Sequence, residues 1–198
     1  MPSELGLKAV VTDPAHLRAA LLGAGGIRRF RGLLRDRRLD RDGAPLSREQ
    51  VLRVRRWIPE QGAERAEIAW KGPAGVSPDG MKQREESELE VEDGAAAERL
   101  FEALGYREAQ AIDRYVEVYH LGRTVVRLEW YPRMDVLVEI GGDVAGIEEV
   151  IRTLRLPREQ CLPEALPSFA LRFEKRTGRP AILAEAELAG EPPTWSDA

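Results

Sequence analysis

Residues 81–92 read MKQREESELEVE, and a charged side chain occupies every second position from Lys82 to Glu92. Side chains two residues apart lie on the same face of a β-strand, so this segment predicts a strand with one continuous charged face. Such a face either meets bulk water or lines an interior that holds a charged ligand. The fold therefore depends on what the other segments place beside it.

The same alternation recurs in other parts of the chain. Arg53 and Arg55 share a face, with Val54 pointing the other way, and Arg127 shares a face with Glu129. About eight strands joined largely by hairpins predict an antiparallel β-barrel in an α+β protein, with the helices packed outside. The predicted strands are residues 4–12, 26–41 (as two short strands), 50–58, 64–71, 81–92, 111–121, 123–131 and 135–141.

Four helices are expected between and after these strands. Asp13 and Asp93 each supply an N-cap for a predicted helix. The other two helices are predicted at residues 144–156 and 164–177. The chain divides into a barrel domain at residues 1–160, a helical extension packed on it at 161–190, and a flexible tail at 191–198.

The composition excludes several classes of protein. The 198 residues are 43% hydrophobic and 32% charged, which excludes a disordered chain or a coiled-coil rod. No apolar stretch approaches the roughly 20 residues of a membrane span, and no secretory signal is visible. A single cysteine, Cys161, excludes an internal disulfide and favours the cytoplasm. With only two histidines, any metal is expected to have oxygen ligands.

The charges are mixed along the chain and sum to −4. No membrane or nucleic-acid partner is expected, and the basic stretch at residues 28–38 is interpreted as a solvated face. Two interpretations of the alternating charges stay open. In one, each strand shows its charges to water, as half-buried antiparallel strands do. In the other, the barrel has a charged lumen that suits a polyphosphate with a divalent metal, because arginine and lysine bind phosphate oxygens and carboxylates bind Mg²⁺ or Mn²⁺.

Several short motifs follow one another from residue 4 to residue 142. They are Glu4-Leu5-Gly6-Leu7-Lys8, Asp36-Arg37-Arg38-Leu39-Asp40, Leu52-Arg53-Val54-Arg55, Lys71-Gly72-Pro73, Lys82-Gln83-Arg84-Glu85-Glu86, Leu104-Gly105-Tyr106, Leu128-Glu129 and Glu139-Ile140-Gly141-Gly142. Because these motifs occur in this order, the chain resembles the CYTH superfamily, also called triphosphate tunnel metalloenzymes. The Lys-Gly-Pro and Leu-Gly-Tyr segments look most like class IV adenylyl cyclases. The resemblance implies that residues 1–160 form a tunnel domain with a barrel fold.

The resemblance also implies a site in which cations hold phosphates and carboxylates hold Mg²⁺ or Mn²⁺. The implied phosphate-binding residues are Lys8, Arg53, Arg55, Lys71, Lys82, Arg84, Arg114 and Arg127. The implied metal ligands are Glu4, Glu86, Glu88, Glu129 and Glu139. The implied partner is ATP, thiamine triphosphate or inorganic triphosphate, turned over by an adenylyl cyclase or a triphosphatase, and a homodimer is allowed. No catalytic side chain is assigned, because this chemistry needs no covalent nucleophile.

Three positions depart from the superfamily pattern. Gly6 and Gly141 stand where metal-binding glutamates are usual, and Glu129 replaces an aspartate. Losing two carboxylates predicts weaker metal binding and slow turnover at best. Three functional classes stay open: a metal-dependent phosphohydrolase or cyclase with altered metal use, a non-catalytic nucleotide or polyphosphate binder with a degenerate metal site, and a structural protein with a vestigial tunnel.

Overall fold

The computed structural model describes residues 3–41 and 50–198, without the side chains of Ser3, Glu4 and Asp197. The strands are β1 (Ser3–Val10), β2 (Ile27–Arg41), β3 (Val51–Pro59), β4 (Arg65–Val76), β5 (Lys82–Val91), β6 (Tyr106–Leu121), β7 (Thr124–Trp130) and β8 (Leu137–Gly141). The α-helices are α1 (Pro14–Gly23), α2 (Gly94–Ala103), α3 (Val144–Thr153) and α4 (Leu166–Thr177). Short 3-10 helices lie at Arg158–Gln160, Glu185–Glu187 and Thr194–Asp197.

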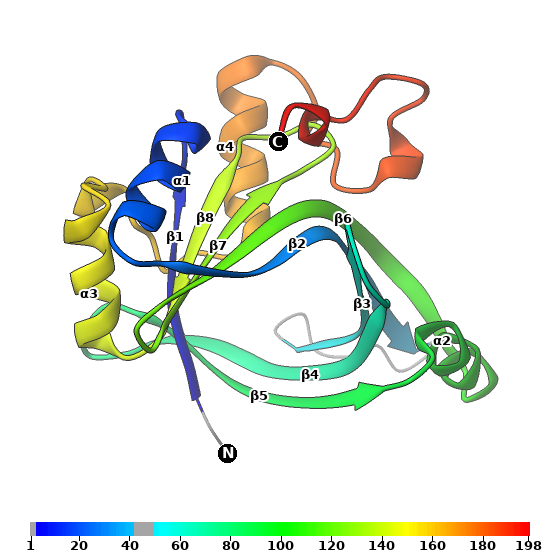
Figure 1. Ribbon diagram of the computed structural model, residues 1–198. Coiled ribbons are helices and arrows are strands. Elements are labelled where there is room, and N and C mark those ends of the chain that lie inside the picture. Colours follow the sequence, from blue (N-terminus) through cyan, green and yellow to red (C-terminus); the bar gives the residue numbers. More distant parts are fainter. Residues whose placement is uncertain (1–2, 42–49) are drawn as a thin grey trace.

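The strands close into one antiparallel barrel. Their order around the wall is β1-β5-β4-β3-β2-β6-β7-β8, and β8 pairs back onto β1, so that the strands in Figure 1 form a closed ring. Closure gives each of the described strands a hydrogen-bonded neighbour on both sides, which removes the exposed edges that open sheets must protect. The antiparallel α+β barrel predicted from the alternation is confirmed.

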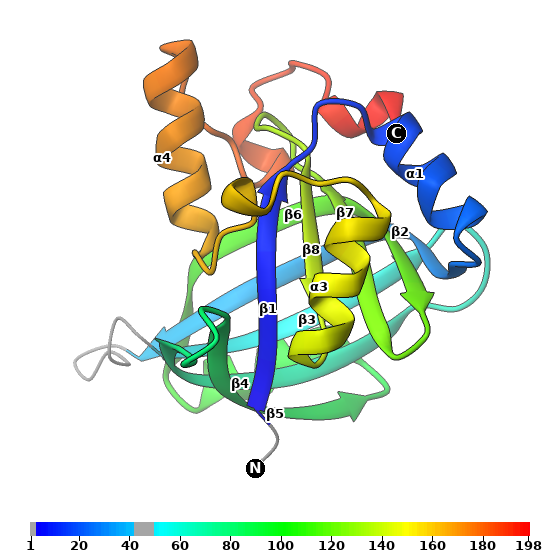
Figure 2. The same cartoon turned by 90° about the vertical axis from the view of Figure 1, so that its left-hand side faces the viewer.

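The helices cover the outside of this barrel. Helices α1, α3 and α4 lie on the side formed by β1, β7 and β8, and α2 packs against β3, β4 and β6 on the other side (Figures 1 and 2). The predicted N-caps are confirmed, because Asp13 and Asp93 each accept a hydrogen bond from the backbone N–H three residues on. Within the described ranges, no helix is long and apolar enough to cross a membrane.

Apolar side chains fill the space between the barrel and the helices. Leu7, Val138 and Ile140 of the wall pack against Ile147 and Ile151 of α3. Each of these three wall residues is one position away from a charged or glycine position of its strand. Because the pleat sends successive side chains to opposite faces, burying these residues beneath the helices directs their neighbours into the lumen.

An apolar plug ends the charged part of the lumen. It consists of Leu34, Trp57, Val116 and Val118, with the Phe30 ring edge-on to Trp57 at 5.0 Å between ring centroids. Trp57 comes two residues after Arg55 on β3, and Val116 comes two residues after Arg114 on β6, so each shares a strand face with that arginine. The inner face therefore changes from charged to apolar along two strands, which leaves a lumen with one filled region and one polar region.

The pair of short strands predicted at residues 26–41 is wrong, because β2 is continuous over Ile27–Arg41. At Gly32 the φ is 154°, and a Cβ atom there would lie 2.2 Å from the carbonyl oxygen of Ile58. Glycine permits this close backbone approach. The strand therefore passes close to β3 at Gly32 and keeps its pairing to β3 and β6.

The C-terminal segment packs onto the barrel. Leu166 and Phe169 of α4 join a cluster with Leu137 of the wall. The structure differs from the expected flexible tail at 191–198, because Trp195 packs against the main core. An indole ring supplies a large apolar area, which holds this segment to the barrel.

Candidate functional site

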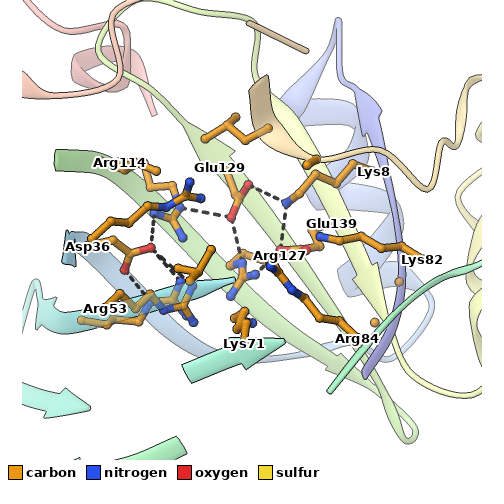
Figure 3. A pocket seen from close by; sticks show the side chains of 18 of the residues that line it. Lys8, Asp36, Arg53, Lys71, Lys82, Arg84, Arg114, Arg127, Glu129 and Glu139 are labelled. Atoms are coloured by element: carbon orange, nitrogen blue, oxygen red, sulfur yellow. Dashed lines mark hydrogen bonds and ion pairs between the residues drawn. The ribbon is translucent and has the colours of Figure 1, made fainter. Parts of the chain in front are cut away.

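The barrel encloses a cavity whose lining is dominated by cations (Figure 3). Nine basic side chains of the described residues line it: Lys8, Arg38, Arg53, Arg55, Lys71, Lys82, Arg84, Arg114 and Arg127. Three carboxylates line it as well: Asp36, Glu129 and Glu139. All eight residues predicted to bind phosphate are among these nine cations. Of the two interpretations of the alternating charges, the structure has the charged lumen.

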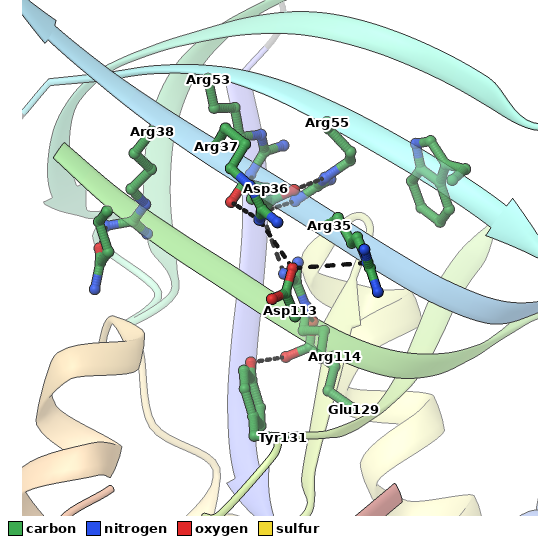
Figure 4. Close-up of polar contacts among 12 residues, drawn as sticks. Arg35, Asp36, Arg37, Arg38, Arg53, Arg55, Asp113, Arg114, Glu129 and Tyr131 are labelled. Carbon is green, nitrogen blue, oxygen red and sulfur yellow. Dashed lines mark hydrogen bonds and ion pairs between the residues drawn. The ribbon is translucent and has the colours of Figure 1, made fainter. Parts of the chain in front are cut away.

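Asp36 is the centre of one half of the lining (Figure 4). Arg55 holds both oxygens of this buried carboxylate, with Nε donating to Oδ1 at 2.6 Å and Nη2 donating to Oδ2 at 2.9 Å. Arg114 donates to Oδ2 at 3.2 Å, and Arg53 pairs with it at 3.6 Å. Burial acts to raise the pKa of Asp36, but these three guanidinium groups hold it well below the usual value. Asp36 is therefore a permanent anion that positions arginines from two other strands.

Glu129 and Glu139 form the centre of the other half. Lys8 bridges them, with Nζ 3.2 Å from Glu129 Oε2 and 2.9 Å from Glu139 Oε2. Arg127 bridges the same two carboxylates, with Nε 2.9 Å from Glu129 Oε1 and Nη2 hydrogen-bonded to Glu139. Burial acts to raise the pKa of Glu129, but Lys8, Arg114 and Arg127 lower it to about 2. We refer to Lys8, Arg127, Glu129 and Glu139 as the charge quartet.

Arg53 and Arg38 of the lining have buried N–H groups without a hydrogen-bond partner among the described residues. Arg53 is 93% buried, since its exposed fraction is 7%, yet its Nε and Nη2 have no hydrogen-bond partner among the described residues. The carboxylates that pair with Nη2 stand at 3.5–3.9 Å, beyond a good hydrogen bond. Burial, followed by the nearby Arg55, lowers the pKa of Arg53 to about 10. The Nε of Arg38, which lies directly opposite Arg53 in the β2–β3 pair, also has no partner in the described structure.

Lys71, Lys82 and Arg84 complete the lining from β4 and β5. Arg84 Nε donates to the carbonyl oxygen of Gly72, and Lys71 pairs with Glu86. Burial, opposed by Glu139 and reinforced by neighbouring cations, lowers the pKa of Lys82. A nearby anion would stabilise the charged form of Lys82 and raise its pKa again.

The predicted metal ligands are separated into two groups. Glu129 and Glu139 line the cavity, but Glu86 and Glu88 lie on β5 and pair with Arg53 at 3.7 Å and 3.5 Å. The side chain of Glu88 is 47% exposed. The side chain of Glu4 is outside the described part of the chain. The carboxylates that the resemblance assigned to metal therefore do not converge in the described structure.

The donor set of the described residues does not fit a divalent metal. Mg²⁺ and Mn²⁺ need several oxygen ligands at one point, and no group of three or more acidic, histidine or cysteine side chains gathers within the described ranges. Glu129 and Glu139 come together, but each is already paired with Lys8 and Arg127. Gly6 of β1 lies directly opposite Gly141 of β8, and neither adds an oxygen ligand from a side chain.

Four residues of the site were not assigned from the sequence. Asp36 belongs to a quoted motif, which could have indicated its role. Arg38 was interpreted as solvated, and this is wrong because it lines the cavity. Tyr131 donates to Glu129 Oε2 at 2.7 Å, and Trp57 Nε1 donates to Glu67 Oε2 at 3.1 Å. Asp36 and Arg38 carried a sequence signal, since they belong to the same motif and share a strand face.

Solved structures provide the comparison with known proteins, since neither family models nor curated protein sequences give a match. The PH1012 protein from Pyrococcus horikoshii OT3 is 21% identical with a TM-score of 0.68, and the match covers 84% of this chain and 98% of that one. A proposed adenylate cyclase from Vibrio parahaemolyticus is 13% identical with a TM-score of 0.67, covering 84% and 96%. The proposed adenylyl cyclase HpAC1 from Hippeastrum, described as having a dominant triphosphatase activity, is 15% identical with a TM-score of 0.62, covering 94% and 99%.

These likenesses establish the fold. The chain has a closed eight-stranded antiparallel barrel, the triphosphate-tunnel type of fold predicted from the sequence, and the three solved structures share this fold. At identities of 13–21%, they assign no activity to this chain.

Proposed function

We propose that this protein binds a triphosphate, either inorganic or carried by a nucleotide or thiamine, with the phosphates in the lumen of the barrel. One observation carries the proposal: nine cations and three carboxylates among the described residues line one cavity. In a confined space of low dielectric, so many like charges repel one another strongly unless an anion lies among them. A linear chain of phosphates is an anion that suits such a lining, because it presents negatively charged oxygens along its whole length.

Arg53 and Arg38 support the proposal most directly. They lie opposite one another on β3 and β2, and both have N–H groups without partners in the described structure. A phosphate oxygen accepts from guanidinium groups in the same way as a carboxylate. Each such charge-assisted hydrogen bond contributes about 1.5–3 kcal/mol, so two arginines together would bind one phosphoryl group tightly.

Turnover of the bound triphosphate is the second candidate function. The activity described for the Hippeastrum protein favours a triphosphatase, and the Vibrio comparison favours an adenylyl cyclase. In either reaction, the arginines of the lining would stabilise the charge that develops on the transferred phosphoryl group. We place binding first, because the carboxylates of the lining are engaged with cations. The homodimer and the cytoplasmic location stay predictions.

Isothermal titration calorimetry tests the proposal. Inorganic triphosphate, ATP and thiamine triphosphate are each titrated into the protein, once with EDTA and once with Mg²⁺, and sulfate serves as the simple-anion control. We expect saturable binding of at least one triphosphate to wild type. Arg53→Met should bind it about tenfold more weakly or worse, because this substitution removes at least one charge-assisted contact. Arg152→Met is the matched control, because the Arg152 side chain is 73% exposed on α3. Absence of binding in both buffers would contradict the proposal, and phosphate release from a bound ligand would establish turnover.

A further inference from the structure

We infer that the lumen binds its triphosphate in the metal-free form, and that Lys8 and Arg127 take the place of a divalent cation between Glu129 and Glu139. The inference rests on the proposed function and concerns the same cavity. It follows from the charge quartet, in which two carboxylates and two cations alternate (Figure 3).

The quartet is complete without a metal. Each carboxylate pairs with both cations, at 3.2 Å and 2.9 Å for Lys8 and at 2.9 Å for Arg127 with Glu129. Glu129 is 1% exposed, and Tyr131 and Arg114 also donate to its two oxygens. A metal ion would have to displace three hydrogen-bond donors and the Arg127 ion pair from Glu129 alone, in a place where the remaining cations repel it.

The two glycines place no side-chain carboxylate beside the charge quartet to attract its cations. Gly6 and Gly141 are cross-strand partners, and both line the cavity beside Lys8 and Glu139. Glutamates at these positions would add two negative charges next to the quartet, which would draw Lys8 and Arg127 away from their present partners. With glycine at both positions, Lys8 and Arg127 keep their bridging geometry between Glu129 and Glu139.

The rest of the lining favours the uncomplexed anion. Outside the quartet, seven cations and one carboxylate line the cavity: Arg38, Arg53, Arg55, Lys71, Lys82, Arg84, Arg114 and Asp36. A divalent metal bound to triphosphate neutralises two of its charges and occupies oxygens that arginines would otherwise contact. The free anion therefore makes more charge-assisted contacts with this lining than the metal complex does.

Calorimetry with inorganic triphosphate separates the metal-free from the metal-bound form. We expect binding in EDTA and binding that is weaker by about tenfold or more in excess Mg²⁺, the loss that follows from removing one charge-assisted contact. Mn²⁺ alone, titrated into wild type, is expected to give no saturable heat. Binding that requires Mg²⁺ or Mn²⁺, or saturable binding of Mn²⁺ alone, would overturn this inference but leave the proposed function standing. Absence of triphosphate binding in both buffers would overturn both.

Two double variants test whether Lys8 and Arg127 take the place of a divalent metal. Arg127→Met combined with Gly141→Glu removes one bridging cation and adds one carboxylate, so we expect weaker metal-free binding and a new Mn²⁺ signal in calorimetry. Lys8→Met combined with Gly141→Glu makes the same exchange from β1, in case the first variant does not fold by circular dichroism. Arg152→Met combined with Gly75→Glu is the matched control, because these two positions are exposed. A folded exchange variant that binds triphosphate like wild type and gains no Mn²⁺ would contradict the inference.

Discussion

Gly6 of β1 and Gly141 of β8 lie directly opposite one another in the barrel wall. The space around them is not equal. A Cβ atom at Gly6 would lie 3.2 Å from the backbone oxygen of Ile140, whereas at Gly141 the nearest atom, the backbone oxygen of Leu5, would be 3.6 Å away. Two positions that look alike in the sequence therefore differ in what they tolerate.

Alanine substitutions at the two glycines are expected to have opposite effects on stability. Gly141→Ala should raise the free energy of unfolding by about 0.4–1 kcal/mol, because the unfolded chain loses freedom and the new methyl group fits. Gly6→Ala should lower it, since the atom crowded by the new methyl group belongs to the backbone and cannot turn away. Urea denaturation measures both. Equal stabilisation by the two substitutions would show that the wall relaxes at Gly6.

Arginines on the two faces of the barrel wall are expected to differ in triphosphate binding. Arg84 lines the cavity, whereas Arg37 lies on the outer face and pairs with Asp113 at 2.8 Å (Figure 4). Arg84→Met should weaken binding by about tenfold or more, with a smaller effect at high salt, and Arg37→Met should leave it within about twofold. Calorimetry at two salt concentrations tests this. A larger loss for Arg37→Met would place the phosphate site outside the lumen.

The buried pair of Arg55 and Asp36 is expected to matter for stability as well as for binding. Arg55→Met leaves the Asp36 carboxylate buried without its two shortest hydrogen bonds, and should lower the free energy of unfolding by about 3 kcal/mol or more. Arg56→Met is the matched control, because Arg56 makes a similar two-bond pair with Glu64 at the surface. The control should cost about 1 kcal/mol or less. Equal losses in urea denaturation would contradict a special role for burial.

Glu129 predicts a loss of stability in acid. Its pKa is about 2 in the folded protein against an ordinary value of 4.5, so its contribution is fully present above about pH 4.5. As the pH falls toward about 2, the unfolded state binds the proton more readily and the contribution is lost. Glu129→Gln should therefore be less stable at neutral pH, because Lys8, Arg114 and Arg127 each lose one carboxylate partner, and should show a flatter decline in this window. Urea denaturation at several pH values measures how steeply the free energy of unfolding falls in acid. The same slope in wild type and Glu129→Gln would show that Glu129 is not the group responsible.

The sequence alone was sufficient for the architecture and for most of the lining. In a strand, the facing of a side chain follows from parity, which is a local property, so the charged faces of β3 and β5 could be assigned without knowing their neighbours. The N-caps of α1 and α2 are local for the same reason. The continuity of β2 could not be predicted, because it depends on how closely Gly32 approaches Ile58 of the next strand.

Only the tertiary structure decided which charges neutralise one another. Lys8 and Glu129 are 121 residues apart, and their pairing depends on β1 and β7 both flanking β8 in the closed wall. The same holds for Asp36, whose partners come from β3 and β6 on either side of β2. Parity shows that a carboxylate points inwards, but its availability to a metal depends on the cations that barrel closure brings within about 3 Å, where an ion pair in a low-dielectric lumen is strongest. The sequence therefore determined that the lumen is charged, and the fold determined that its carboxylates are held by lysine and arginine.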